Sequence, residues 1–144
     1  MKKYILNIAF LGVIVFFGSL ASCKDDVSAE EAAKALLIGN GSKTWTIQSV
    51  QVNGTDQTSL FTGMTIKFSA TSYTTTNGGL VWPSGTWTFT DATAKSFKRG
   101  DGIDVQFTAT SNALTLSMTW DKTTLGSGRV GSIAGPHVFK FVAP

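Results

Sequence analysis

The chain has few of the side chains on which most catalytic and metal sites depend. It contains one cysteine, Cys23, and one histidine, His137, in 144 residues. A single cysteine excludes an intramolecular disulfide bond, and a zinc site needs several cysteine or histidine ligands. A Ser-His-Asp triad would need His137 as its base, and no Gly-x-Ser-x-Gly motif selects a serine partner. We therefore expect no enzyme activity, metal or cofactor, and interpret His137 as a structural hydrogen-bonding residue.

Charged residues are also scarce, at 15% of the chain. The formal net charge of +3 falls by two, to +1, when Lys2 and Lys3 are left out. The local basic cluster at residues 95–99 lies beside Asp101 and Asp104, so we expect no basic face and no nucleic-acid partner. These two aspartates supply too few oxygens for a calcium site, and we interpret their segment as a hairpin turn.

The N-terminus has the organisation of a secretory signal peptide. Lys2 and Lys3 precede an apolar run from Ile5 to Phe17, and small residues follow from Gly18 to Ser22. The run is too short to cross a hydrocarbon core of roughly 30 Å comfortably. The pattern predicts a signal peptide over residues 1–22, with a retained membrane anchor as the alternative.

The end of this segment, Leu20-Ala21-Ser22-Cys23, resembles the lipobox of bacterial lipoproteins. The resemblance implies cleavage before Cys23 and acylation of that cysteine, for example with palmitate, which anchors the chain to a membrane. Each buried CH₂ of an acyl chain contributes about 0.8 kcal/mol. The following Lys24-Asp25-Asp26 resembles the export signal of lipoproteins of the Bacteroidetes type. It implies an outer-membrane protein exposed at the cell surface, with a periplasm-facing location as the alternative.

Residues 23–41 are expected to be a lipidated tether that contains a short helix. Ser28 and Glu31 form a capping-box pattern, and Gly39 is a typical residue at a helix C-terminus. We predict a helix from about Ser28 to Leu37, whose apolar end docks on the following domain or plugs one end of it. The alternative is a partly frayed spacer, because isolated helices of this length are marginally stable.

Residues 42–144 have the composition of one all-β domain. All threonines lie between Thr44 and Thr124, and Gly and Asn-Gly pairs separate the segments. Residues 55–62 are interpreted as a loop. Alternation of apolar and polar residues predicts eight strands, at 45–52, 64–69, 72–76, 85–90, 95–99, 103–110, 114–120 and 137–142. Short connections between them predict an antiparallel meander barrel of about eight strands, with a β-sandwich as the alternative.

The β domain resembles the lipocalin-like (calycin-like) domains of Bacteroidetes-type lipoproteins. The resemblance rests on Lys43-Thr44-Trp45 at the start of the first strand, the segment Ser84–Phe89, and the late strand around Leu114-Thr115-Leu116. It implies an eight-stranded antiparallel barrel with an apolar interior that is open or partly closed at one end. We expect the protein to be a monomer.

The large apolar residues on the inward faces of these strands are the candidate ligand pocket. They are Phe68, Tyr73, Trp87, Phe89, Phe107, Met118 and Trp120. The expected ligand is a small apolar or amphipathic molecule. Eight-stranded barrels can also be filled by their own side chains. The alternative is therefore a structural or interaction lipoprotein, accessory to a glycan-uptake or adhesion complex, that works through its loops.

Two loops are candidates for an open rim, Leu80–Pro83 and the glycine-rich segment Gly126–Gly131. A small extra strand is considered at Val130–Ile133. Trp82 is either exposed, where it could stack on a sugar or lipid, or folded over the barrel end, because a tryptophan buries a large area.

Overall fold

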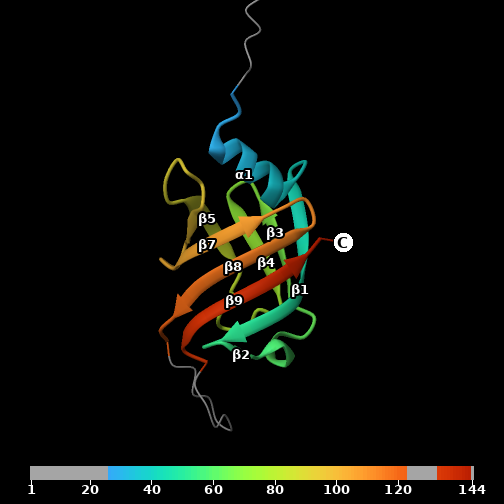
Figure 1. The fold of residues 1–144 in the computed structure, drawn as a ribbon, viewed down its shortest axis with the longest axis vertical. Coiled ribbons are helices and arrows are strands. Elements are labelled where there is room, and N and C mark those ends of the chain that lie inside the picture. The colour runs from blue at the N-terminus through green and yellow to red at the C-terminus, as the bar shows by residue number, and fades with distance from the viewer. Residues whose placement is uncertain (1–25, 123–132, 144) are drawn as a thin grey trace, which may run out of the picture.

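The computed structural model describes residues 26–122 and 133–143, and in this part of the chain a helix precedes one continuous sheet (Figure 1). The helix α1 spans Ala29–Ile38, and a short 3₁₀ helix, η1, spans Thr58–Phe61. The strands are β1 (Ser42–Val52), β2 (Thr55–Asp56), β3 (Thr65–Ser69), β4 (Ser72–Thr76), β5 (Gly85–Phe89), β6 (Ser96–Arg99), β7 (Asp104–Ala109), β8 (Ala113–Trp120) and β9 (Gly135–Val142).

The sheet closes on itself as a barrel. Strands pair in the order β2-β1-β3-β4-β5-β6-β7-β8-β9, and β9 also pairs with β1. All these pairings are antiparallel, so β1 and β3 to β9 form an eight-stranded meander barrel with β2 as a short addition to β1. The predicted barrel is confirmed, and the β-sandwich alternative is wrong. Closure leaves each of the eight barrel strands paired on both sides.

Strand boundaries follow the sequence pattern because alternate residues of a strand face opposite sides of the sheet. In β8, Leu114, Leu116, Met118 and Trp120 are buried, and the residues between them are partly or fully exposed. All eight predicted strands are present, seven of them within two residues of their predicted ends, whereas β1 begins three residues earlier than predicted.

The predicted loop at residues 55–62 is partly wrong. Asn53 and Gly54 both have positive φ angles, 52° and 77°, which is the conformation of a two-residue type I′ hairpin turn. This turn brings Thr55 and Asp56 back to pair with Gln51 and Val52 as β2. Both β2 residues are exposed, so no apolar alternation marked them as a strand.

The helix α1 closes the end of the barrel at which β1 begins, which we call the helix end (Figure 1). Both halves of the Ser28–Glu31 capping box are present, and α1 lies within one residue of its predicted bounds. Leu37 is fully buried in the core, and the Trp45 indole N–H donates a 3.1 Å hydrogen bond to the Leu37 carbonyl. The predicted docking of the helix end on the domain is confirmed.

The opposite end of the barrel, which we call the plug end, is closed by two connecting segments. Phe61 of η1 is buried and lies edge-on to Phe139 with ring centroids 5.3 Å apart. The 77–84 segment folds inward, so that Val81 and Trp82 are each 1% exposed. This loop was predicted to be part of an open rim, and that prediction is wrong, because the large apolar area of Trp82 is buried against Phe139 and Tyr73.

Candidate ligand-binding site

The candidate pocket residues all contribute to the interior of the barrel. Five are buried, and the other two, Phe89 and Phe107, are partly buried and packed against the same core. The buried members are Phe68, Tyr73, Trp87, Met118 and Trp120.

Five of the candidates form a continuous row of aromatic rings. Tyr73 contacts Phe68 with ring centroids 5.8 Å apart, and Phe68 contacts Trp87 at 5.9 Å. Trp87 then contacts Phe89 at 5.0 Å, and Phe89 stacks on Phe107 at 6.1 Å. These separations lie in the 4.5–7 Å range of favourable aromatic pairs. The row occupies the interior with side chains and becomes accessible at its Phe89–Phe107 end.

The accessible end of this row adjoins a cleft between α1 and the barrel. The cleft has a volume of about 270 Å³, and its lining includes Trp87, Phe89 and Thr71 of the barrel together with Glu30 and Lys34 of α1. The Trp87 indole N–H donates a 3.0 Å hydrogen bond to the Ser69 carbonyl, which fixes the ring. Sequence reasoning missed Glu30 and Lys34. Their i, i+4 spacing on one helix face was the available signal.

The remaining candidates, Met118 and Trp120, lie at the plug end, away from this cleft. The Met118 Sδ accepts a hydrogen bond of 3.4 Å from Nη1 of Arg99. Strand β8 carries both residues inward, because they share the buried face with Leu116. The structure therefore divides the predicted pocket into a row that leads to the helix end and a pair at the plug end.

Sequence reasoning misplaced Arg99, a charged residue of the barrel interior. It was grouped with Lys95 and Lys98 as a local basic cluster, but it is 1% exposed and lies in the barrel interior. Its Nη1 donates to the Val81 carbonyl at 2.8 Å, and its Nη2 pairs with Asp101 at 2.6 Å. The available signal was its position two residues after Phe97 in the same strand, which places both on the inward face.

Arg99 also influences the Tyr73 hydroxyl. Burial raises the pKa of Tyr73 above its ordinary value of 10.0, and the nearby Arg99 guanidinium opposes that shift. The same tyrosine packs edge-on to Trp82, with ring centroids 5.7 Å apart. Trp82 is thus folded over the barrel end, and the alternative of an exposed stacking platform is wrong.

His137 has the surroundings of a structural histidine. Its Nδ1 lies 2.9 Å from the Gly135 carbonyl oxygen, and its ring stacks on Phe139 at 5.6 Å. Burial lowers the pKa of His137 below its ordinary value of 6.5. The prediction of a hydrogen-bonding role is confirmed.

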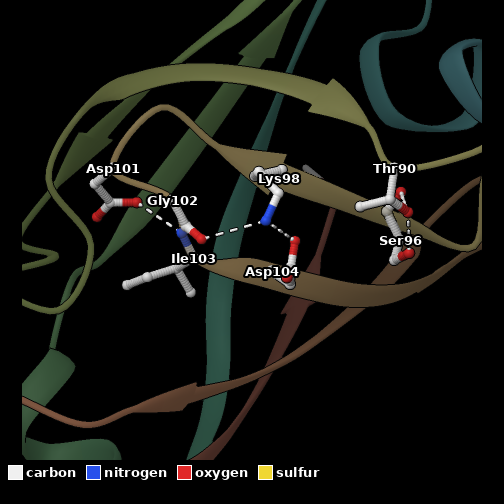
Figure 2. Close-up of polar contacts among 7 residues, drawn as sticks. All are labelled: Thr90, Ser96, Lys98, Asp101, Gly102, Ile103 and Asp104. Carbon is white, nitrogen blue, oxygen red and sulfur yellow. Dashed lines mark hydrogen bonds and ion pairs between the residues drawn. The ribbon is translucent and has the colours of Figure 1, made fainter.

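The β6–β7 connection is the predicted hairpin turn, and Figure 2 shows its polar contacts. Lys98 pairs with Asp104 at 2.7 Å across the two strands, and its Nζ also lies 3.5 Å from the Gly102 carbonyl. The Asp101 carboxylate accepts from the Ile103 N–H at 3.5 Å and pairs with Arg99. Each aspartate thus faces a cation of this chain. Among residues 26–122 and 133–143, no three His, Cys, Asp or Glu side chains are grouped as a metal site would require.

The outer face of the barrel carries two neighbouring grooves that sequence reasoning did not find. One has a volume of about 570 Å³ and the other about 290 Å³, and both are lined by Gln106 of β7 and Ser117 of β8. Thr108 and Thr115 extend the first groove. Most of their lining residues are polar, and Phe107 in the first groove and Met118, Pro136 and Val138 in the second add apolar surface.

Cys23 and the Gly126–Gly131 segment lie outside the described residues, as does most of the strand considered at Val130–Ile133. In the part of the chain that is described, no helix is long and apolar enough to cross a membrane. Comparisons with protein-family models, with curated proteins and with solved structures gave no match.

Proposed function

We propose that this protein is a membrane-anchored, lipocalin-like lipoprotein that binds a small amphipathic ligand at the helix end of its barrel and catalyses no reaction. The observation that carries the proposal is the cleft of about 270 Å³ beneath α1. It gives outside access to Trp87 and Phe89 of an otherwise buried aromatic row. Small-molecule sites are typically concave and apolar with a few polar groups at their edge.

The charges at this cleft support an amphipathic rather than a purely apolar ligand. Glu30 and Lys34 lie on its helix side, and Trp87 and Phe89 on its barrel side. A ligand with an apolar part would cover the rings, and its polar part would pair with the charged side chains of α1. No polar group would then be buried without a partner. The rings of Phe68 and Tyr73 continue the row inward, so the ligand would lie at the mouth of the barrel.

The proposed lipid on Cys23 would hold this same end near a membrane. Ala29, the first residue of α1, is six positions after Cys23 in the sequence. A chain extends by at most about 3.6 Å per residue, so α1 would begin within roughly 22 Å of the anchor. The cleft would then open close to a lipid surface, which is a source of amphipathic molecules. We propose an outer-membrane location exposed at the cell surface, on the resemblance of residues 24–26 to an export signal.

Mass spectrometry of the native protein tests the ligand. The full-length protein would be purified from its own host in mild detergent, and small molecules retained by it would be identified. We expect a retained amphipathic molecule that is reduced at least several-fold in Phe89→Ala, which removes one wall of the cleft. Leu80→Ala is the matched control, because Leu80 is 72% exposed at the opposite end. Equal retention in both variants would contradict a site at the helix end.

Membrane fractionation tests the anchor. Cys23→Ala removes the thiol that would carry the acyl chains, and we expect this variant to leave the membrane fraction. Continued tight association of the variant with membranes would overturn the lipoprotein proposal.

A second candidate function is a structural or interaction lipoprotein with a solid barrel and no ligand. The row of contacting rings from Tyr73 to Phe107 favours it, since these side chains fill much of the interior themselves. Absence of any retained molecule in the native protein would favour this candidate over the first.

A further inference from the structure

Within residues 26–122 and 133–143, four buried polar atoms toward the plug end have no hydrogen-bond partner. They are Trp82 Nε1, Arg99 Nε, Trp120 Nε1 and His137 Nε2. The four residues are between 1% and 4% exposed, so water outside the protein does not reach them freely. An unpartnered buried donor or acceptor costs about 1–3 kcal/mol, so four of them in one region call for a polar partner.

The four side chains are neighbours. The guanidinium carbon of Arg99 lies 4.4 Å from the centroid of the Trp82 ring. Arg99 also contacts Met118, which is paired with His137 across β8 and β9. Trp120 lies two residues beyond Met118 on the same buried face of β8. The unpartnered atoms therefore come from one region of the barrel interior, separate from the cleft beneath α1.

Three of these atoms are donors and one is an acceptor. Indole Nε1 and guanidinium Nε carry hydrogens and can only donate. The His137 Nδ1 faces the Gly135 carbonyl at 2.9 Å, and a carbonyl only accepts, so Nδ1 carries the hydrogen. Because burial lowers the pKa of this histidine, its ring is neutral near pH 7 and Nε2 is an acceptor. A partner must consequently both accept and donate hydrogen bonds.

The partner is also expected to be neutral. The positive charge of Arg99 is already balanced by Asp101, with Nη2 and Oδ2 2.6 Å apart. A further charge in this buried region would have no counter-ion and would be costly to desolvate. A hydroxyl group is neutral and offers one donor and two acceptor positions.

The other two tryptophans show that unpaired indoles are not general in this barrel. The Trp45 indole N–H donates to the Leu37 carbonyl at 3.1 Å, and that of Trp87 donates to the Ser69 carbonyl at 3.0 Å. Both are buried, as Trp82 and Trp120 are. We propose that the plug end is a second binding site, for a small neutral molecule that carries neighbouring hydroxyl groups, such as a polyol.

The indole N–H resonances of the four tryptophans provide the test. The sample would be the full-length, ¹⁵N-labelled protein in detergent micelles. Its indole N–H signals would be assigned by through-bond experiments, which need no tryptophan variants. The protein would then be titrated with glycerol. We expect the Trp82 and Trp120 indole signals to shift downfield in a saturable manner, whereas those of Trp45 and Trp87 stay in place. The Trp87 signal also reports on the cleft beneath α1, so this result is independent of the function proposed above.

Two comparison titrations and one variant sharpen the result. Propanol has the apolar skeleton without neighbouring hydroxyls, and acetate carries a charge; we expect neither to shift the two signals. His137→Phe removes the acceptor, and loss of one hydrogen bond of about 1 kcal/mol should weaken glycerol binding about fivefold. The proposal is overturned if glycerol leaves all four signals unchanged, if it shifts all four alike, or if acetate shifts Trp82 and Trp120 more than glycerol does.

Discussion

The Arg99 guanidinium lies 4.4 Å from the centre of the Trp82 ring and donates a 2.8 Å hydrogen bond to the Val81 carbonyl. One side chain of β6 therefore holds both residues that fold inward from the 77–84 segment. Because Arg99 is buried and paired with Asp101, its charge is compensated within the same region. Closure of the plug end depends on this arginine.

Replacement of Arg99 by methionine should destabilise the protein strongly. Arg99→Met loses the hydrogen bond to Val81 and the pair with the solvent-accessible Asp101. Because hydrogen bonds made by a charged group contribute about 1.5–3 kcal/mol each, we expect a loss of at least about 2 kcal/mol. Urea denaturation measures the change. Lys98→Met is the matched control from the next position. Its pair with Asp104 is largely exposed, so we expect a loss below about 1 kcal/mol. Similar losses in both variants would contradict the role given to Arg99.

The docking of α1 on the barrel should depend on Leu37 and not on its neighbour Leu36. Leu37 is fully buried, whereas Leu36 is 37% exposed. Leu37→Ala removes a core side chain and should lower the free energy of unfolding by about 3 kcal/mol. Leu36→Ala should change it by less than about 1 kcal/mol. Amide hydrogen exchange of α1 would locate the effect, and a larger loss for Leu36→Ala would show that the helix packs through another face.

Gly78 should tolerate no side chain. A Cβ atom placed there would meet the Trp82 carbonyl oxygen and would lie 2.5 Å from Cγ2 of Thr75. Gly78→Ala must displace the inward-folded segment, and we expect it to destabilise the protein by about 1–3 kcal/mol. Thermal denaturation measures this change, with the exposed Leu80→Ala of the same loop as control. A Gly78→Ala protein as stable as the control would mean that the loop can move away at little cost.

Stability should decrease on mild acidification because of His137. Its folded-state pKa lies below 6.5, so the unfolded chain takes up a proton at higher pH than the folded protein does. The stabilisation is complete above about pH 6.5 and is lost as the pH falls through the folded pKa. Denaturation at about pH 5 and pH 7.5 measures the difference, since most carboxylates titrate below this window. His137→Phe should abolish most of this dependence. If the stability of His137→Phe still falls by the same amount between pH 7.5 and pH 5, the pH dependence arises from other groups.

The strands and the helix could be predicted from local patterns. Two-residue alternation marks β8 because each apolar side chain points to the same face, and the Ser28–Glu31 capping box marks the start of α1 because its bonds are local. The exposed strand β2 could not be predicted this way, since it is defined only by backbone pairing with β1.

The candidate site was predicted in part. The inward position of Phe89 and Phe107 followed from alternation, but their place at an accessible end depends on where α1 lies. Arg99 was misplaced because a charged residue is rarely buried without partners. Asp101 lies only two residues away in the sequence, but the Val81 carbonyl is brought to Arg99 only by folding.

The sequence by itself determined that this chain forms an all-β domain with a capped helix before it, because periodicity and capping act over a few residues. Closure of the sheet as a barrel depends on the pairing of β1 with the distant β9. Only the tertiary structure decided that Trp82 closes one end, that α1 covers the other, and that unpaired donors gather around Arg99. These features depend on which distant segments meet, and burial and hydrogen-bond satisfaction are properties of that assembly rather than of any local stretch.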